Sequence, residues 1–378
     1  MDRPVYLDCN ATTPIEPRVK DIVLQFLEED FGNAGSRTHE FGNQASKAVI
    51  SARNQVAKVV QANPDEVIFT SGATESNNIA ILGLASYGIS ANKKHIVSTK
   101  IEHKAVLEPL HHLARSGFEV TLISPTPEGW IDPEEVARAL RPDTLLLSVM
   151  HVNNETGVIQ PIADIADAIS RHPVIFHCDA AQGFGKELEQ LLNSRIDLIS
   201  ISAHKIFGPK GVGSLVSRKR GNQRLPLEAV TYGGGQERGL RPGTLPVHLI
   251  AGLGLAAEIA VRENEMRKKK CLDFKMRLLK ELDSFDLRFY GDDHRTLFNC
   301  KNLSIAGIDS EAVMIAVKDL IAISNGSACT SMSHKPSHVL RAMGISGDES
   351  ETATRWSWCH MTEEPDWGEI SNRLTALL

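Results

Sequence analysis

Short runs of apolar, mostly β-branched residues alternate along the chain with stretches of helical periodicity, up to about residue 217. Seven such runs are predicted as strands, at 66–70, 95–100, 119–124, 144–150, 173–179, 198–204 and 211–217. Near-continuous apolar strands separated by helices are typical of a largely parallel sheet that is covered on both faces. The pattern therefore predicts an α/β fold, in which ligands collect at the carboxyl ends of the strands.

The pattern changes beyond these strands. A glycine-rich stretch at 232–244 precedes a long helical region at about 245–282, and the remainder predicts a smaller α+β region. A chain of 378 residues suits one large or two moderate domains, and we predict a boundary near residue 255. The predicted parts are a large α/β domain at 15–255 and a small α+β domain formed by 1–14 and 256–378.

Charge and hydropathy exclude several classes of protein. The formal net charge is −6, so the basic footprint of a nucleic-acid-binding protein is missing. The densest basic run, 267–270, lies in a helical stretch and is interpreted as a solvated helix face. No apolar run approaches the ~20 residues of a membrane-spanning helix, and the N-terminus lacks signal-peptide architecture. We expect a cytoplasmic protein that binds neither membranes nor nucleic acid directly.

The cysteines form no local motif. They are Cys9, Cys178, Cys271, Cys300, Cys329 and Cys359. Without a CxxC pair no local zinc or iron–sulfur site is expected, so we predict no metal, and only a site assembled from distant cysteines stays open. Cys329 stands out because its neighbours in SNGSACTS (324–331) are all small or polar. This setting is typical of a mobile loop and of a reactive thiol, the alternative being a merely solvent-exposed one.

Polar side chains follow two of the predicted strands. Asp179 ends one strand and Gln182 comes three residues later, while His204 and Lys205 end the next strand. Lysine is rarely buried unless it is paired or chemically used, and a desolvated lysine becomes a nucleophile toward carbonyl groups. Taken alone, Asp179 could simply cap a helix and Lys205 could simply emerge to solvent.

A third group lies between a predicted strand and a helix. The small residues of TSGATES (70–76) leave backbone N–H groups and hydroxyls available to an anion, although a plain capping turn would look the same. A phosphate cradle, an acid for a pyridinium nitrogen and a reactive lysine are together what pyridoxal 5'-phosphate (PLP) requires. His103 follows another strand end, where its ring could stack on this cofactor.

Nine ordered motifs carry a resemblance to a known family. They are YLDCNATTP (6–14), SRTHEFG (36–42), FTSGATESNN (69–78), EHKAV (102–106), HVNNETG (151–157), DAAQ (179–182), SAHKIFGPKG (202–211), GGGQERGLRPGTLPVH (233–248) and SNGSACTS (324–331). With them the chain resembles the cysteine desulfurases of the NifS/IscS kind, among the class V aminotransferase-type PLP enzymes. The resemblance implies the fold-type I architecture of PLP-dependent transferases.

The resemblance also implies how the cofactor is bound. Lys205 would carry it covalently, Asp179 would pair with the ring nitrogen, and Gln182 would bond the ring hydroxyl. His103 would stack on the ring and assist proton transfer. The residues implied for the phosphate are Ala73, Thr74, Ser202 and His204, together with Thr244 from the partner subunit. A homodimer whose sites are completed across the interface is therefore implied.

The implied reaction takes sulfur from L-cysteine. Asn154 would lie near the substrate, and Arg355 would bind its carboxylate, for which a bidentate guanidinium is suited. Lys205 would remove the Cα proton. Cys329 would attack the substrate sulfur as a thiolate, keep it as a persulfide and pass it to an acceptor protein, an iron–sulfur protein being one candidate. Asn325 replaces the second serine of SSGSACTS, the family's usual form of this motif.

Other features favour one branch of the family. The sequences RWSWCHMTEE (355–364) and NAGSRTHEFG (33–42), with an early C-terminus, resemble the DndA branch, which supplies sulfur for DNA phosphorothioation. The alternative is general sulfur supply for iron–sulfur clusters and tRNA thiolation. Cys359 departs from the family, either as a harmless substitution or as a second thiol near the pocket.

Three rival functions stay open. The first is another PLP enzyme, such as a selenocysteine lyase or an aminotransferase. The second is a sulfur carrier or iron–sulfur module without catalysis. The third is a thiol hydrolase, which would need His334 or His338 and an orienting acid to face Cys329.

Overall fold

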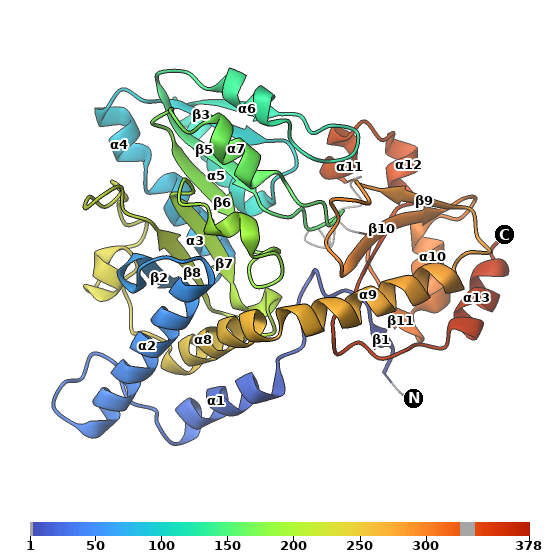
Figure 1. Ribbon diagram of the computed structural model, residues 1–378, viewed down its shortest axis with the longest axis horizontal. Coiled ribbons are helices and arrows are strands. Elements are labelled where there is room, and N and C mark those ends of the chain that lie inside the picture. The colour runs from blue at the N-terminus through green and yellow to red at the C-terminus, as the bar shows by residue number, and fades with distance from the viewer. Residues whose placement is uncertain (1–2, 326–336) are drawn as a thin grey trace.

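The computed structural model describes residues 3–325 and 337–378. All seven predicted strands form one sheet, in the order β2-β8-β7-β6-β5-β3-β4 (Figure 1). They are β2 (Val67–Thr70), β3 (His95–Thr99), β4 (Glu119–Ile123), β5 (Thr144–Met150), β6 (Ile175–Asp179), β7 (Leu198–Ser202) and β8 (Gly213–Ser217). Only β8 runs antiparallel to its neighbours. The predicted α/β class with a mostly parallel sheet is confirmed.

Helices cover both faces of this sheet because successive strand residues point to opposite sides. In β6, Phe176 and Cys178 join the core cluster under α2, α7 and α8, whereas Ile175 joins the cluster under α3 and α5. The helices of this part are α1 (Pro17–Glu28), α2 (Glu40–Val59), α3 (Ala73–Leu82), α4 (Ala85–Ser90), α5 (Lys104–Arg115), α6 (Pro133–Ala139), α7 (Ile162–Ala168) and α8 (Val247–Arg262).

A second apolar core lies in the C-terminal part, around Trp356 and Trp358. Its strands are β9 (Leu287–Tyr290), β10 (Cys300–Ile305) and β12 (Thr354–Ser357) in one antiparallel sheet, and β1 (Val5–Tyr6) paired in parallel with β11 (Ile321–Ala322). Its helices are α9 (Asn264–Glu281), α10 (Ser310–Val317), α11 (His338–Ala342), α12 (Gly347–Glu351) and α13 (Trp367–Thr375). The N-terminal strand thus joins the C-terminal part (Figure 1).

The helical region predicted at 245–282 consists of two helices, α8 and α9, which meet at Glu263. Ile259 of α8 packs in the first core, and Cys271 of α9 packs in the second. The helices lie end to end between the two parts of the molecule (Figure 1). A domain boundary near residue 255 stays a prediction.

The interpretation of residues 267–270 as a solvated helix face is wrong for its first member. Arg267 is buried, and its guanidinium lies 2.9 Å from Glu16 Oε2 and 3.0 Å from Glu263 Oε2. The three lysines that follow are exposed, as expected. In residues 3–325 and 337–378, no helix is both long enough and apolar enough to cross a membrane.

The packing of α8 on α2 depends on Gly254. A Cβ at this position would lie 2.5 Å from the Ala52 Cα atom of α2. We predict that Gly254→Ala lowers the free energy of unfolding by about 1–3 kcal/mol, because overpacking outweighs the gain in helix propensity. Gly368→Ala in α13 is the matched control, since its Cβ would meet only Asp366 Oδ1, at 3.5 Å. Urea titrations of both variants would measure the difference, and equal midpoints would contradict the prediction.

Candidate active site

A cavity of about 490 Å³ opens at the carboxyl ends of the parallel strands. The residues that follow these strands meet there because the strands run in the same direction. Ten of the predicted site residues line it: Ala73, Thr74, His103, Asn154, Asp179, Gln182, Ser202, His204, Lys205 and Arg355. Thr244 is exposed and is not among the residues that line this cavity. Cys329, with its predicted loop mobility, lies outside the described residues.

The Asp179 carboxylate is held in a fixed orientation at the end of β6. Its Oδ2 atom accepts a hydrogen bond of 2.8 Å from Asn77 Nδ2, and its Oδ1 atom accepts one of 3.0 Å from the Ala181 N–H. The side chain is almost fully buried but lines the cavity. Asp179 therefore caps the turn that follows it and also presents a negative charge to a ligand.

The Lys205 amine is held by the N-terminal segment of the chain. Lys205 ends η3 (Ala203–Lys205), the short helix directly after β7, and its Nζ atom donates to the carbonyls of Asn10 at 2.5 Å and Ala11 at 2.7 Å. The alternative of a lysine that simply emerges to solvent is therefore wrong. These carbonyl groups hold the amine in the cavity.

The N-terminus of α3 faces the same cavity. Gly72 provides no side-chain cap, so the first N–H groups of the helix, at Ala73 and Thr74, are available to an anion. Gly72 has a φ of 154°. A Cβ atom at this position would lie 3.6 Å from Ser202 Oγ and would fill part of the space between Gly72 and Ser202. This geometry is compatible with the predicted anion cradle, which stays a prediction.

The His204 imidazole completes the cradle. Its Nδ1 atom lies 3.0 Å from Thr12 Oγ1. Burial, with smaller effects of nearby lysines, lowers the pKa of His204 to about 4. The ring is therefore neutral at pH 7 and can act as a hydrogen-bond donor without carrying charge.

The arrangement fits PLP. Among the buried oxygen atoms of residues that line the cavity, Asn77 Oδ1 and Gln182 Oε1 have no hydrogen-bond partner in the described part of the chain. Buried polar atoms normally have partners, so these two indicate a polar ligand. Gln182 Oε1 suits a ring hydroxyl, Asp179 suits a pyridinium nitrogen, and the α3 N-terminus suits a phosphate.

Arg355 reaches the cavity from β12, in the other part of the molecule. Its Nη1 atom donates to the Asn154 carbonyl at 3.0 Å, and its Nη2 atom lies 2.5 Å from Asp8 Oδ1. Ser324 Oγ donates to the same Asp8 oxygen at 3.2 Å. Backbone hydrogen bonds also join Ser324 and Arg355 in both directions, at 3.3 and 2.6 Å. The guanidinium is thus tied to the residue that begins SNGSACTS.

Sequence reasoning missed three residues of this site: Asp8, Asn10 and Asn77. All three lie in motifs that carried the family resemblance, YLDCNATTP and FTSGATESNN. No chemistry was assigned to them because their partners are distant in the chain. Asp8 and Arg355, for example, are separated by 347 positions.

Comparisons with known proteins agree with this geometry. Residues 5–366 match the family model described as aminotransferase class-V, so the chain belongs to the class-V aminotransferase family, whose members are PLP-dependent enzymes. Among curated relatives, "Cysteine desulfurase IscS" of Anaeromyxobacter dehalogenans is 47% identical over 369 residues, covering 97% of this chain and 90% of the relative.

Two solved structures are also similar over most of their length. A "NIFS-LIKE PROTEIN" has a TM-score of 0.89 at 34% identity, covering 100% of this chain and 98% of that chain. DndA from Streptomyces lividans has a TM-score of 0.83 at 49% identity, covering 95% of this chain and 99% of that chain.

We predict that Lys205 alone carries the cofactor. After loading with PLP, reduction with borohydride makes a lysine–cofactor bond permanent, and intact mass spectrometry then detects one added cofactor per chain. Lys205→Ala should show no added mass. Lys210→Ala is the matched control because Lys210 lines the same cavity, and it should retain the full addition. Labelling of Lys205→Ala at Lys210 would contradict the prediction.

Proposed function

We propose that the protein is a cysteine desulfurase, which releases L-alanine from L-cysteine and places the sulfur on Cys329 as a persulfide. The observation that carries the proposal is the meeting of Lys205, Asp179 and Arg355 in one cavity, in a chain that also contains SNGSACTS. A lysine and an acid serve any PLP enzyme, whereas the cysteine segment favours sulfur transfer. The curated relatives, named cysteine desulfurases, support the same activity.

Each group at the cavity has a part in the reaction. Bound PLP stabilises the electron pair that remains when the Cα–H bond of an amino acid breaks. Lys205 Nζ, released from the carbonyls of Asn10 and Ala11, accepts the Cα proton. His103 is the N-cap of α5, and its Nδ1 atom accepts a hydrogen bond of 3.1 Å from the Ala105 N–H, which orients the ring. His103 would stack on the bound cofactor and assist proton transfer.

Arg355 binds the substrate carboxylate in competition with Asp8. The Asp8 carboxylate occupies one side of the guanidinium, which is itself buried. A substrate carboxylate must share or replace this contact, and the link from Asp8 to Ser324 carries the change to the start of the cysteine segment. Cys329 then attacks the substrate sulfur as a thiolate and passes it on to an acceptor protein.

The protein acts as a homodimer in this proposal. Large apolar side chains are exposed on and beside α1 and α2, among them Phe31, Phe41 and Ile50, and Tyr232 is exposed near Thr244 in sequence. The rings of Phe31 and Phe41 stack with their centroids 5.3 Å apart. Apolar groups in such numbers favour burial against a second copy. Thr244 would then complete the phosphate site of the partner subunit.

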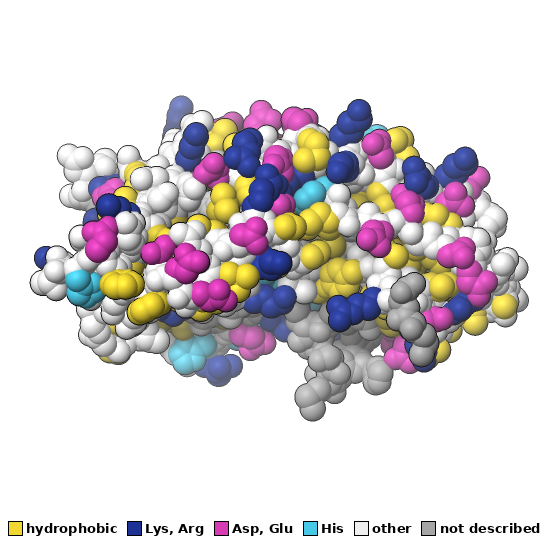
Figure 2. Space-filling model, turned by 90° about the horizontal axis from the view of Figure 1, so that it is seen from below, with side chains coloured by type: hydrophobic (Ala, Val, Ile, Leu, Met, Phe, Trp, Pro, Cys, Tyr) yellow, Lys and Arg dark blue, Asp and Glu magenta, His cyan; other side chains and the backbone are white. Residues whose placement is uncertain are grey.

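We propose that the sulfur is used for DNA phosphorothioation and that an acceptor protein carries it there. The 49% identity to DndA over 99% of that chain supports this branch. The IscS relatives, at 47% identity, support the alternative of general sulfur supply. With a net charge of −6 and with basic and acidic side chains interspersed on the face in Figure 2, direct DNA binding is disfavoured.

Cys329→Ser tests the desulfurase itself. The variant should lose persulfide and sulfide production, because no other thiol stands in this sequence context. It should keep the change in visible absorbance that L-cysteine causes in PLP-loaded protein, because substrate binding does not need the thiol. Cys271→Ser, which removes a buried cysteine, is the control and should retain turnover. Undiminished alanine formation by Cys329→Ser would instead favour a selenocysteine lyase or another PLP enzyme.

Asp8→Asn tests the competition for Arg355. Asparagine keeps an oxygen for the guanidinium but removes the negative charge that opposes a substrate carboxylate. We therefore expect the KM for L-cysteine to fall several-fold. Arg355→Leu should raise KM by roughly 10²-fold, since hydrogen bonds to charged groups contribute about 1.5–3 kcal/mol each. A higher KM in Asp8→Asn would show that Asp8 serves to position Arg355 and does not compete.

The pathway is tested in cells and in vitro. Deleting the gene should abolish phosphorothioate dinucleotides in digested genomic DNA, measured by mass spectrometry, and leave thiolated tRNA nucleosides unchanged. The opposite pattern would favour general sulfur supply. The purified protein should give no mobility shift with duplex DNA at low salt, and a tight, salt-dependent complex would contradict transfer through an acceptor protein.

A further inference from the structure

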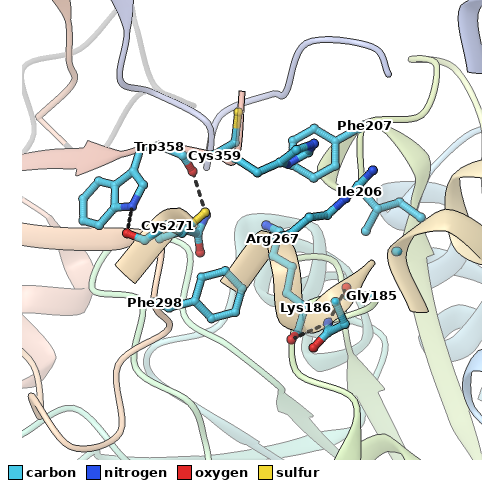
Figure 3. A pocket seen from close by; sticks show the side chains of 13 residues that line it. Gly185, Lys186, Ile206, Phe207, Arg267, Cys271, Phe298, Trp358 and Cys359 are labelled. Atoms are coloured by element: carbon cyan, nitrogen blue, oxygen red, sulfur yellow. Dashed lines mark hydrogen bonds between the residues drawn. The ribbon is translucent and has the colours of Figure 1, made fainter. Parts of the chain in front are cut away.

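A second, much smaller cavity of about 20 Å³ lies apart from the proposed reaction. Figure 3 shows Trp358 and Cys271 on one side of it, Phe207 and Ile206 on the other, and Lys186 extending between them. Cys359 also lines it. The proposed function uses none of these groups.

Cys359 and Cys9 lie in contact beside this cavity. They form a small buried cluster with Phe207, and only 5% of Cys359 and 1% of Cys9 is exposed. The backbone keeps them together, because the Cys9 N–H donates to the Ser357 carbonyl at 2.9 Å and the Ser357 N–H donates to the Leu7 carbonyl at 2.8 Å. The two side chains are therefore close enough for each thiol to act on the acidity of the other.

Several groups favour negative charge on the Cys359 sulfur. The Thr362 hydroxyl donates to it at 3.6 Å. Lys186 is more than nine-tenths buried, and its Nζ atom has no hydrogen-bond partner within the described part of the chain. Burial lowers the pKa of Lys186, and its charged form lowers the pKa of both thiols.

The two thiols of the pair therefore differ in acidity. The Cys9 side chain is the main cause that lowers the pKa of Cys359, and the Cys359 side chain is the main cause that raises the pKa of Cys9. Burial raises the pKa of Cys271, which lines the same cavity, to about 12. Cys359 is thus set apart from its neighbours as the nucleophilic thiol.

We propose that Cys9 and Cys359 are a redox modification site, at which hydrogen peroxide oxidises the two thiols to a disulfide. The Cys359 thiolate attacks one peroxide oxygen, the O–O bond breaks, and the departing hydroxide takes a proton. Cys359 is then a sulfenic acid. Cys9 attacks its sulfur, the S–O bond breaks and water leaves with the Cys9 proton, so the two thiols lose two electrons to the peroxide.

The size of the cavity selects this class of oxidant. A space of about 20 Å³ holds about one water molecule. Hydrogen peroxide is only slightly larger than water, whereas a disulfide such as oxidised glutathione cannot enter. The pair is therefore expected to respond to small peroxides and not to thiol–disulfide exchange.

The bond would join two segments that also reach the active-site cavity. Asn10, next to Cys9, accepts the hydrogen bond from Lys205, and Arg355 lies four residues before Cys359. A covalent link between these segments would restrict how Arg355 moves relative to Lys205. This consequence rests on the proposed function, whereas formation of the disulfide does not.

The test uses PLP-loaded Cys329→Ser protein, so that the thiol in SNGSACTS does not react. After a brief exposure to hydrogen peroxide, free thiols are blocked under denaturing conditions. The intact mass and the linked peptides are then measured without reduction. We expect the loss of two thiols and of the mass of two hydrogen atoms, a linked Cys9–Cys359 peptide pair, and full reversal by dithiothreitol. Oxidised glutathione should give no such product.

Variants separate this site from general oxidation. Cys9→Ser and Cys359→Ser should each abolish the link, whereas Cys271→Ser, the matched control in the same cavity, should retain it. Lys186→Met should slow its formation roughly tenfold, because the thiolate loses its nearby cation. A Cys271–Cys359 link, or a Cys359 sulfinic acid with Cys9 still free, would overturn the proposal.

The functional consequence is measured separately, by titrating oxidised and reduced Cys329→Ser protein with the product L-alanine and following the visible absorbance. We expect oxidation to raise the half-saturating concentration several-fold. If the Cys9–Cys359 link forms but the half-saturating concentration does not change, the effect on the active site is refuted and the redox site is not. If the link forms in protein whose visible absorbance does not respond to amino acids, the proposed function is refuted, whereas the proposal of a redox site still holds.

Discussion

The N-terminal segment at 7–13 is hydrogen-bonded on both of its sides, and the cavity depends on this double attachment. On one side, backbone bonds join Leu7 and Cys9 to Ser357, at the end of β12. On the other side, the Thr13 N–H donates to the His204 carbonyl at 3.0 Å, and Lys205 Nζ donates to Asn10 and Ala11. The segment thereby places the arginine of one part of the molecule opposite the lysine of the other.

The same segment determines the charges at the cavity. Asp8 forms an ion pair with Arg355, so the buried guanidinium has a counter-ion. The Lys205 amine donates to the carbonyls of Asn10 and Ala11. The segment thus orients the lysine through backbone carbonyls and the arginine through a buried ion pair.

The tertiary surroundings, and not residue type, divide the described cysteines into different chemical classes. All five are free thiols and all are buried. Burial raises the pKa of Cys178, Cys271 and Cys300, so these remain inert packing groups. Cys359 is equally enclosed but accepts a hydrogen bond from Thr362 and lies near Lys186. Cysteines that look alike in sequence thus differ in their expected reactivity.

The sequence by itself determined the strands, the class of the sheet and the chemistry expected at the strand ends. Hydrophobic periodicity is a local property, and the residues after parallel strands must meet at one edge. Asp179 and Lys205 therefore lie where the strand pattern placed them. Their contacts with Asn77 and Asn10 come from elsewhere in the chain, and the strand pattern did not predict them.

Only the tertiary structure decided which distant residues meet. Asp8 pairs with Arg355 across 347 positions, and Arg267 is buried on Glu16 although its neighbours made it look like part of a solvated face. Lys186 and Cys359 are a third pair of residues that are distant in sequence and close in the structure. Such pairings depend on how helices and strands pack, and the energy of a buried charge depends on partners that no local pattern of residues specifies.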